Sequence, residues 1–295
     1  MSGGGFAAVW EVETGDGRHL VLKVAPPAGA RLLRYEANLL AAEAAYFRRL
    51  HKDAPSVPVP VVVACDTEAL LMTRLPGEAL TAYEESMDTD ASRDGLGRVM
   101  TQVHQLQGDR FGYTGDRPSG RSWPDAYRAI VEALLADAET FSVALQDVPR
   151  RVRRAVDAAA NALACVTRPT VVHFDLWDGN VLATVDGDGV PRMTGLVDGE
   201  RWLCGDPLID FVSPALFRRI EDEPHGPFVS GYRAAAGVDP LDWPAAAERL
   251  ALSRLWLALL MVVEMPSRAM TGPEHAQWES FLRQQLEERL KELGG

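Results

Sequence analysis

One short β-rich stretch within a mainly helical half of the sequence constrains the fold most. Residues 170–175 have the apolar character of a strand that runs into a loop, and the tetrad Asp186-Gly-Asp-Gly189 is a turn signal between two further strand patterns. Antiparallel pairing across this turn brings its two flanks together. We therefore expect Asn180 and Asp198 at the open end of one hairpin, where the loop that carries Asp175 also begins.

The remaining apolar periodicity predicts an α+β chain of two unequal lobes. The early patterns indicate two strands, one long helix and two strands, at residues 6–12, 19–24, 31–50, 61–63 and 69–73. Later segments show helical spacing of three and four, at residues 96–106, 126–141, 152–165, 243–265 and 274–293. The expected domains are a small β-rich, nucleotide-binding lobe over residues 1–76 and a larger, mainly helical lobe over residues 77–295.

Cysteine spacing and apolar run length limit the class of protein. The three cysteines are scattered and form no C-x-x-C pair, which argues against a disulfide framework and a structural zinc site. The N-terminus lacks a basic segment followed by an apolar one. The longest apolar run, residues 255–263, is about half the length that a bilayer requires. We expect a cytoplasmic protein with no membrane partner.

The charge of the chain is unevenly distributed. It has 42 acidic and 30 basic residues, a formal net charge of −12, and the first 76 residues carry eight of each kind. The acid excess therefore follows Pro76. A negative field there disfavours nucleic acid as a partner and would concentrate a cationic small molecule, with a merely solvated surface as the alternative explanation. The sequence carries no signal for an oligomeric state.

The polar residues around the hairpin are of the types that phosphoryl transfer requires. The carboxylate of Asp175 can orient a hydroxyl group, and Asn180 and Asp198 offer the hard oxygen ligands that Mg²⁺ prefers. Lys23, on the 19–24 strand, can contact the phosphates of a nucleotide. No G-x-x-x-x-G-K-[ST], dinucleotide fingerprint or G-x-S-x-G elbow occurs, so other phosphate-binding and hydrolase motifs are excluded.

A family resemblance supports the same chemistry. Val172-His-Phe-Asp-Leu-Trp-Asp-Gly-Asn180 resembles the H-x-D-x-x-x-x-N catalytic loop of the aminoglycoside phosphotransferases and the related choline, fructosamine and homoserine kinases. Leu196-Val-Asp-Gly-Glu200 resembles their metal-binding segment, and Gly205-Asp-Pro-Leu-Ile-Asp-Phe211 the stretch after it. A weaker resemblance to the same family covers residues 3–6, 21–24, 70–77 and 103–106. The resemblance implies a bilobal fold similar to that of protein kinases, with ATP and Mg²⁺ as cofactors.

The resemblance also implies roles for individual residues. Asp175 would be the catalytic base or the group that orients the acceptor hydroxyl, with His173 as a brace of the catalytic loop. Asn180 and Asp198 would hold Mg²⁺, and Lys23 would contact the nucleotide phosphates. The glycine-rich loop would cover those phosphates, and the hinge would bind adenine; these two sets are Gly3, Gly4 and Gly5, and Met72, Thr73 and Leu75.

The lysine needs a carboxylate partner on the predicted 31–50 helix. Glu36 and Glu43 are seven residues apart and would share one helical face. The spacing after Glu43 is more similar to the family pattern, so Glu43 is favoured and Glu36 stays the alternative. One departure from the pattern is Phe174, which stands where glycine is more usual and is expected to affect local packing.

The acceptor is the least constrained part of the hypothesis. The acidic second lobe favours a cationic acceptor such as an aminoglycoside-like antibiotic or an amino sugar. The candidate amine contacts are Asp178, Glu200 and Glu264, and the candidate walls of a sugar site, or else core residues, are Trp177, Trp202 and Trp256. The alternatives are a kinase of a metabolic alcohol or amino alcohol, and a catalytically silent nucleotide-binding protein of the same fold.

Overall fold

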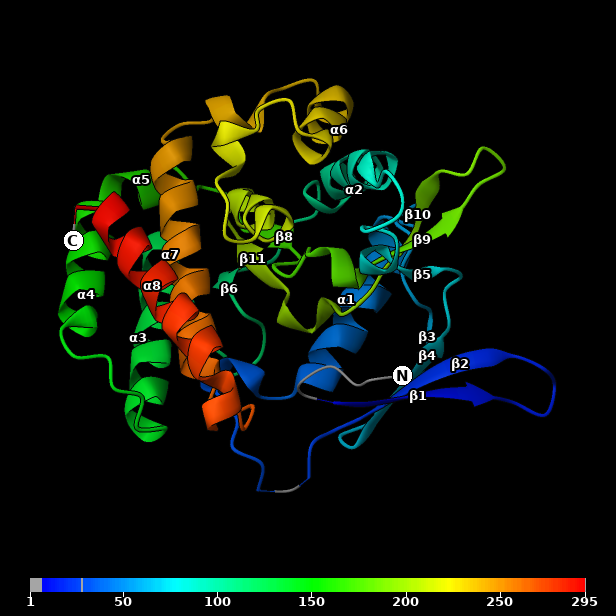
Figure 1. Ribbon diagram of the computed structural model, residues 1–295, viewed down its shortest axis with the longest axis horizontal. Helices are drawn as coiled ribbons and strands as arrows, with labels where there is room; N and C mark the ends of the chain where they lie inside the picture. Colours follow the sequence, from blue (N-terminus) through cyan, green and yellow to red (C-terminus); the bar gives the residue numbers. More distant parts are fainter. Residues whose placement is uncertain (1–6, 28, 295) are drawn as a thin grey trace.

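The computed structural model describes residues 7–27 and 29–294, so the predicted phosphate-covering glycines Gly3, Gly4 and Gly5 lie outside the described residues. A four-stranded antiparallel sheet occupies one end of the molecule and most helices occupy the other (Figure 1). The sheet has the order β1-β2-β4-β3, with strands at Ala8–Glu13, His19–Val24, Ala69–Thr73 and Val62–Cys65. The strands predicted at residues 19–24 and 69–73 match residue for residue.

The helix that packs on this sheet begins later than predicted. Helix α1 spans Leu39–Asp53, not residues 31–50, and a single 3-10 turn, η1, spans Arg34–Glu36 before it. Asn38 separates the two with a left-handed backbone (φ 58°), a conformation that asparagine tolerates better than most residues. The apolar spacing continues across this break, so periodicity alone missed it. As a result Glu36 does not lie on the helix that carries Glu43.

The predicted hairpin forms with the expected register. Strands β9 (Val181–Val185) and β10 (Pro191–Leu196) pair antiparallel, with Val181 opposite Leu196. The short strand β5 (Glu78–Ala79) joins β9 directly after the first sheet ends. Beyond the ladder, the N–H of Val197 donates to the carbonyl oxygen of Asn180 at 3.0 Å. The residues on both sides of the open end are therefore held together.

A third small sheet supports the loop that carries Asp175. Its order is β7-β6-β11-β8, with strands at Ser119–Gly120, Phe111–Gly112, Leu203–Gly205 and Thr170–Val172. Strand β8 is buried throughout and ends immediately before His173. Strand β11 begins shortly after Asp198 and pairs antiparallel with β8, with Leu203 opposite Val172. The pairing therefore brings the segment after Asp198 next to the start of the loop that leads to Asp175.

The larger part of the chain is mainly helical, as predicted. Its helices are α2 (Asp90–Val103), α3 (Trp123–Thr140), α4 (Val148–Ala158), α5 (Ala160–Ala164), α6 (Pro227–Ala236), α7 (Ala246–Glu264) and α8 (Ala276–Glu292). The segment 152–165 forms parts of two helices rather than one, and α6 was not predicted. Short 3-10 turns connect these elements, at Leu80–Ala82, Asp178–Asn180, Gly199–Arg201, Pro207–Phe211, Ser213–Ala215, Ile220–Asp222, Pro240–Asp242 and Pro273–His275.

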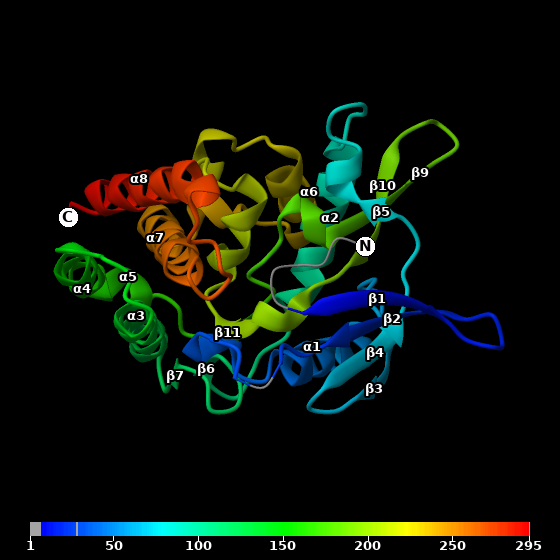
Figure 2. The ribbon, with the colours of Figure 1, turned by 60° about the horizontal axis from the view of Figure 1, so that its bottom comes forward.

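Helix α7 is the central helix of this part. It lies between α8 and α3 in Figure 2, and most of its residues are buried. Trp256, in its middle, is 1% exposed and packs edge-on against Tyr113 and Tyr127. Trp256 is therefore a core residue. Among residues 7–27 and 29–294, no helix combines the length and apolar character needed to cross a membrane.

Helices α2 and α6 approach each other through two glycines. A Cβ atom on Gly97 of α2 would overlap the carbonyl oxygen of Phe228, and one on Gly231 of α6 would overlap that of Asp94. These obstacles are backbone atoms, so neither can be relieved by a side-chain rotation. The close contact of the two helices therefore depends on the absence of side chains at both positions.

Replacing Gly97 by Ala should lower the free energy of unfolding by about 1–3 kcal/mol, because the added methyl group must push the two helices apart. The matched control is Gly95→Ala on the same helix, where a Cβ would meet only Met193 at 3.6 Å. That change should be neutral or stabilising by up to about 1 kcal/mol. Urea denaturation of both variants measures the difference. Equal stability of the two would contradict the close-packing argument.

Candidate active site

Lys23 lies in a buried ion-pair cluster between the two parts of the chain. Its ammonium group, on β2, is 2.8 Å from both carboxylate oxygens of Glu43 on α1. It also contacts the carboxylate of Asp198, which follows β10. Glu43 and Lys23 are 0% and 7% exposed. Of the two carboxylates considered for the lysine, the structure thus places Glu43 against it.

The other candidate, Glu36, has different partners. Its carboxylate accepts a hydrogen bond from the Leu33 N–H at 2.8 Å and lies 2.6 Å from the guanidinium of Arg268. Glu36 is 1% exposed, and burial raises its pKa, with Arg268 opposing that shift. The left-handed break at Asn38 gives the physical reason, because it turns η1 away from the face of α1 that meets β2.

Two members of the cluster, Lys23 and Asp198, are held in the ionised state. Burial alone would lower the pKa of Lys23, but the carboxylates of Asp198, Glu43 and Glu200 outweigh it and raise that pKa above its ordinary value. Burial likewise opposes ionisation of Asp198, yet the ammonium of Lys23 keeps the pKa of that carboxyl below its usual range. Lys23 and Asp198 are therefore charged at neutral pH.

A single buried carboxylate holds the loop between β8 and Asp175. Asp210 accepts hydrogen bonds from the backbone N–H groups of His173 (2.9 Å) and Phe174 (2.6 Å). Its Oδ2 is also 3.0 Å from Nε2 of His104, whose Nδ1 contacts the hydroxyl of Tyr232 at 3.0 Å. Asp210 is 0% exposed, so these partners replace water entirely.

Both ring nitrogens of His173 are used within the protein. Nδ1 accepts a hydrogen bond from the N–H of Asp175 at 3.2 Å, and Nε2 donates to the carbonyl oxygen of Val197 at 3.0 Å. Burial lowers the pKa of His173, which keeps the ring neutral. His173 thereby links the loop of Asp175 to the backbone beside Asp198, which is the geometry expected of a brace.

Phe174 adopts a backbone conformation that normally favours glycine. Its φ is 72°, in the left-handed region, which explains why glycine is more usual at this position. Two contacts stabilise the phenylalanine there. Its N–H donates to Asp210, and its ring stacks on Trp256 with centroids 4.4 Å apart. Strain of about 1–3 kcal/mol at such a residue is thus offset by a buried hydrogen bond and an aromatic contact.

Asp175 faces the interior of a cavity. Its side chain is 22% exposed, and its carboxylate lies 3.8 Å from Nε of Arg201. Burial raises the pKa of Asp175, Arg201 lowers it and Asp198 raises it. The backbone oxygen of Asp175 accepts a hydrogen bond from Nδ2 of Asn180 at 2.8 Å. This bond leaves the side-chain oxygen of Asn180 available for another partner.

Glu200 lies beside the ion-pair cluster and lines the cavity. One oxygen each of Glu200, Glu43 and Asp198 lie within 4.8 Å of one another. Glu200 is 8% exposed, and burial raises its pKa to about 8, with the charge of Asp198 adding to the shift. Within the described residues its carboxylate has no hydrogen-bond partner. Three hard oxygen donors in one place are a set that can hold Mg²⁺.

The cavity has a volume of about 730 Å³. Its lining includes Lys23, Asp175, Asp198 and Glu200, so the structure brings four charged residues of the two parts of the chain to one hollow. Of the other predicted site residues, Asn180, His173 and Glu43 are buried directly behind this lining. The predicted hinge residues are not among those that line the cavity: Met72, Thr73 and Leu75.

The hinge segment offers one free backbone donor. The N–H of Thr73 donates to Val61, and that of Arg74 donates to His19. The N–H of Leu75 has no partner among the described residues. Met72 is 3% exposed and belongs to the core between β4 and α1. Leu75 is therefore the hinge residue whose backbone can bind a further group.

The residues proposed as amine contacts or sugar-site walls differ in their surroundings, and one of them, Glu264, lines the cavity. Asp178 pairs with Arg93, and Glu264 pairs with Arg201 at 3.2 Å. Trp202 is 7% exposed and, like Trp256, belongs to the core. Trp177, by contrast, is 43% exposed and lines the cavity.

Sequence reasoning missed two residues that shape the site. Arg201 directly follows the segment that resembles a metal site, but no spacing marks an arginine as the neighbour of Asp175. Asp210 lies within the stretch Gly205–Phe211 that the family resemblance singled out, and its support of the catalytic loop was not predicted from it. Both roles depend on contacts that are distant in the sequence: Arg201 lies 26 positions after Asp175, and Asp210 lies 37 positions after His173.

Comparisons with known proteins agree with this geometry. The family model described as "Phosphotransferase enzyme family" matches residues 2–249. A crystal structure assigned as a fructosamine-3-kinase from Thermobifida fusca YX-ER1 is 21% identical, with a TM-score of 0.72, over 99% of this chain and 91% of that chain. Choline kinase LicA from Streptococcus pneumoniae is 15% identical, with a TM-score of 0.64, over 96% and 89%.

A third similar structure is the ternary complex of streptomycin, ATP and APH(2″)-IIa, which is 16% identical with a TM-score of 0.59 over 97% of this chain and 94% of that chain. No curated protein sequence matches the chain significantly. At these identities the solved structures establish the kinase-like fold, and the family model covers most of the sequence. The chain therefore belongs to the phosphotransferase enzyme family.

Proposed function

We propose that this chain transfers the γ-phosphate of ATP, in the presence of Mg²⁺, to a hydroxyl group of a small molecule. The observation that carries the proposal is the one cavity lined by Lys23, Asp175 and Asp198 together. Phosphoryl transfer depends chiefly on positioning and on electrostatic stabilisation, and these three side chains are the types that serve both purposes. The complexes of similar structures with ATP or ADP support the choice of nucleotide.

Asn180 and Asp198 are the proposed Mg²⁺ ligands, with Glu200 beside them. The fit rests on the donor set, since Asp198 and Glu200 approach each other closely and the side-chain oxygen of Asn180 is not used by the loop. When bound, Mg²⁺ would neutralise part of the negative charge of the nucleotide phosphates. Lys23 would exchange part of its contact with Asp198 for the nucleotide phosphates, while Glu43 keeps the ammonium in position.

Asp175 is the proposed group that orients the acceptor hydroxyl. Its carboxylate must be ionised to accept that hydrogen bond, and Arg201 opposes the rise in its pKa that burial causes. His173 is not proposed as a proton acceptor, because both of its ring nitrogens already have partners. Its proposed role is to hold Asp175 and the segment around Asp198 in fixed positions relative to each other.

The identity of the acceptor and the cellular location of the protein are still predictions. A cationic aminoglycoside-like antibiotic or amino sugar was expected from the charge of the chain, and a metabolic alcohol or amino alcohol was the alternative. The similar solved structures include proteins of both kinds: an aminoglycoside phosphotransferase and a choline kinase, whose acceptor is an amino alcohol. A catalytically silent protein is disfavoured because Lys23, Asp175, Asn180 and Asp198 are all present. Cytoplasmic localisation is retained as a prediction.

Replacing Asp175 by Asn should lower turnover by about 10²–10⁴-fold, since the amide cannot serve as the anionic acceptor of the hydroxyl proton. Affinity for ADP should stay nearly unchanged, because Asp175 is not proposed to touch the nucleotide. ADP release and calorimetric titration with ADP measure the two effects. The control is Asp188→Asn in the exposed hairpin turn. Full turnover by the Asp175 variant would remove this residue from the mechanism.

Replacing Glu200 by Gln should weaken binding of a divalent cation in the presence of ADP by about tenfold or more. The reason is that a carboxyl group with a pKa of about 8 can lose its proton when it binds a cation, whereas the amide of glutamine keeps the shape of the side chain but cannot become anionic. Titration of Mn²⁺ followed by electron paramagnetic resonance measures the free cation directly. Glu13→Gln, at an exposed position of β1, is the control. Unchanged Mn²⁺ affinity in E200Q would place Glu200 outside the metal site.

A further inference from the structure

The end of the cavity beyond Asp175 has a mainly apolar wall. It is formed by the loop after Ser213, by helix α7 and the segment following it, and by the start of α8. Its apolar lining residues are Trp177, Leu216, Leu257, Met261, Met270 and Trp278. Aromatic rings and thioethers offer large, adaptable contact areas to an apolar ligand but no hydrogen bonds to sugar hydroxyls or ammonium groups, apart from the indole N–H.

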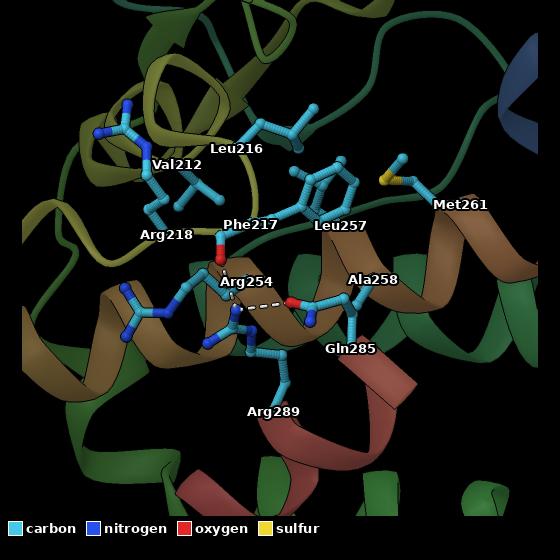
Figure 3. Close-up of a pocket in the computed structure, with 10 residues that line it drawn as sticks. All are labelled: Val212, Leu216, Phe217, Arg218, Arg254, Leu257, Ala258, Met261, Gln285 and Arg289. Atoms are coloured by element: carbon cyan, nitrogen blue, oxygen red, sulfur yellow. Dashed lines mark hydrogen bonds between the residues drawn. The ribbon is translucent and has the colours of Figure 1, made fainter. Parts of the chain in front are cut away.

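The aromatic part of this wall is rigid before any ligand binds. Trp278 stacks on Phe281 at 5.4 Å and meets Phe217 edge-on at 5.7 Å. The carbonyl oxygen of Phe217 accepts a hydrogen bond from Arg289, which also donates to the side chain of Gln285 (Figure 3). A ring that is already held in place loses little conformational entropy when a ligand packs against it.

The neighbouring pocket in Figure 3 cannot take the acceptor. It shares Leu216, Leu257 and Met261 with the cavity wall but has a volume of only about 20 Å³, which is room for about one water molecule. An apolar group that enters from the Asp175 side must therefore stay within the larger cavity, between Trp278 and Trp177.

Trp177 also lines the cavity. It is 43% exposed although it lies two residues from Asp175. Its ring lies over Gly179, where any side chain would overlap the indole. A large exposed indole beside the reacting position is a surface that gains stability when an apolar ligand covers it.

The charged groups at this end are already neutralised by one another. Glu264 lies between two guanidinium groups, 3.2 Å from Arg201 and 3.7 Å from Arg268. Glu36 in turn lies 2.6 Å from Arg268. Two arginines thus face two carboxylates, and Asp175 contributes the remaining negative charge. A molecule with several ammonium groups would find one carboxylate in excess over the arginines here, and to reach the others it would have to break existing ion pairs.

We infer that the acceptor is an alcohol with a bulky, ring-containing apolar body and without a cluster of ammonium groups. The inference rests on the proposed function and specifies its substrate class. The body of the acceptor would pack between Trp177 and Trp278, with its hydroxyl at Asp175. The overall charge of −12 had favoured a polycation, but the ion pairs at the acceptor end outweigh that distant field because they act at contact distance.

Two probes of different chemistry test the inference on the full chain with Mg²⁺ and a non-hydrolysable ATP analogue. Binding of 2-naphthyl β-D-glucoside, a neutral alcohol with a fused-ring body, is compared by calorimetry with binding of kanamycin, a polycation. At about 0.15 M ionic strength the naphthyl glucoside should bind at least about tenfold more tightly. Trp278→Ala and Trp177→Ala should each weaken its binding by about tenfold, whereas Trp10→Ala, at a 60% exposed position of β1, should not.

Each other outcome counts against the inference. Tighter binding of kanamycin, equal binding of naphthyl glucoside by all three tryptophan variants, or binding of neither probe would overturn the acceptor class. Trp177 is exposed, so its variant should fold even if removal of Trp278 disturbs α8, and melting temperatures identify such a disturbance. Failure of the chain to bind the nucleotide analogue would instead overturn the proposed function, which separates the two conclusions.

Discussion

The buried carboxylate of Asp210 is the interaction on which the site depends. It replaces water for two consecutive backbone N–H groups, those of His173 and Phe174, and for the ring of His104. Without it these donors would be buried and unsatisfied, at a cost of about 1–3 kcal/mol each. Because the same loop continues to Asp175 and Asn180, the positions of both follow from this one anchor. His173 then extends the connection to the backbone before Asp198.

The ion-pair cluster around Lys23 joins the two parts of the chain in a similar way. Glu43 belongs to the helix on the N-terminal sheet, and Asp198 follows the hairpin of the larger part. One ammonium group compensates carboxylates from both sides, and the buried carboxyl group of Glu200, with its pKa raised to about 8, lies beside them. Such a cluster is expensive to bury unless another cation shares it, which is why this region suits a divalent ion and a polyanionic ligand together.

The parts of the site that local pattern controls could be predicted from the sequence. The turn at Asp186 determines the hairpin register, so the proximity of Asn180 and the Asp198 segment followed from spacing alone. The start of α1 could not be predicted in this way. The helix begins only after the left-handed backbone of Asn38, although the apolar residues keep their helical spacing on both sides of it. Arg201 depends on tertiary contacts that no local pattern records. Net charge likewise does not record which charges at the cavity are paired, such as that of Glu264 with Arg201.

The stacking of Phe174 on Trp256 joins the catalytic loop to the middle of α7. The same helix carries Leu257, Met261 and Glu264 along one side of the cavity. Because Phe174 directly precedes Asp175, a shift or rotation of α7 would also move the backbone next to the proposed hydroxyl-orienting residue. In this chain, one helix therefore supports both a wall of the cavity and the loop that ends at Asp175.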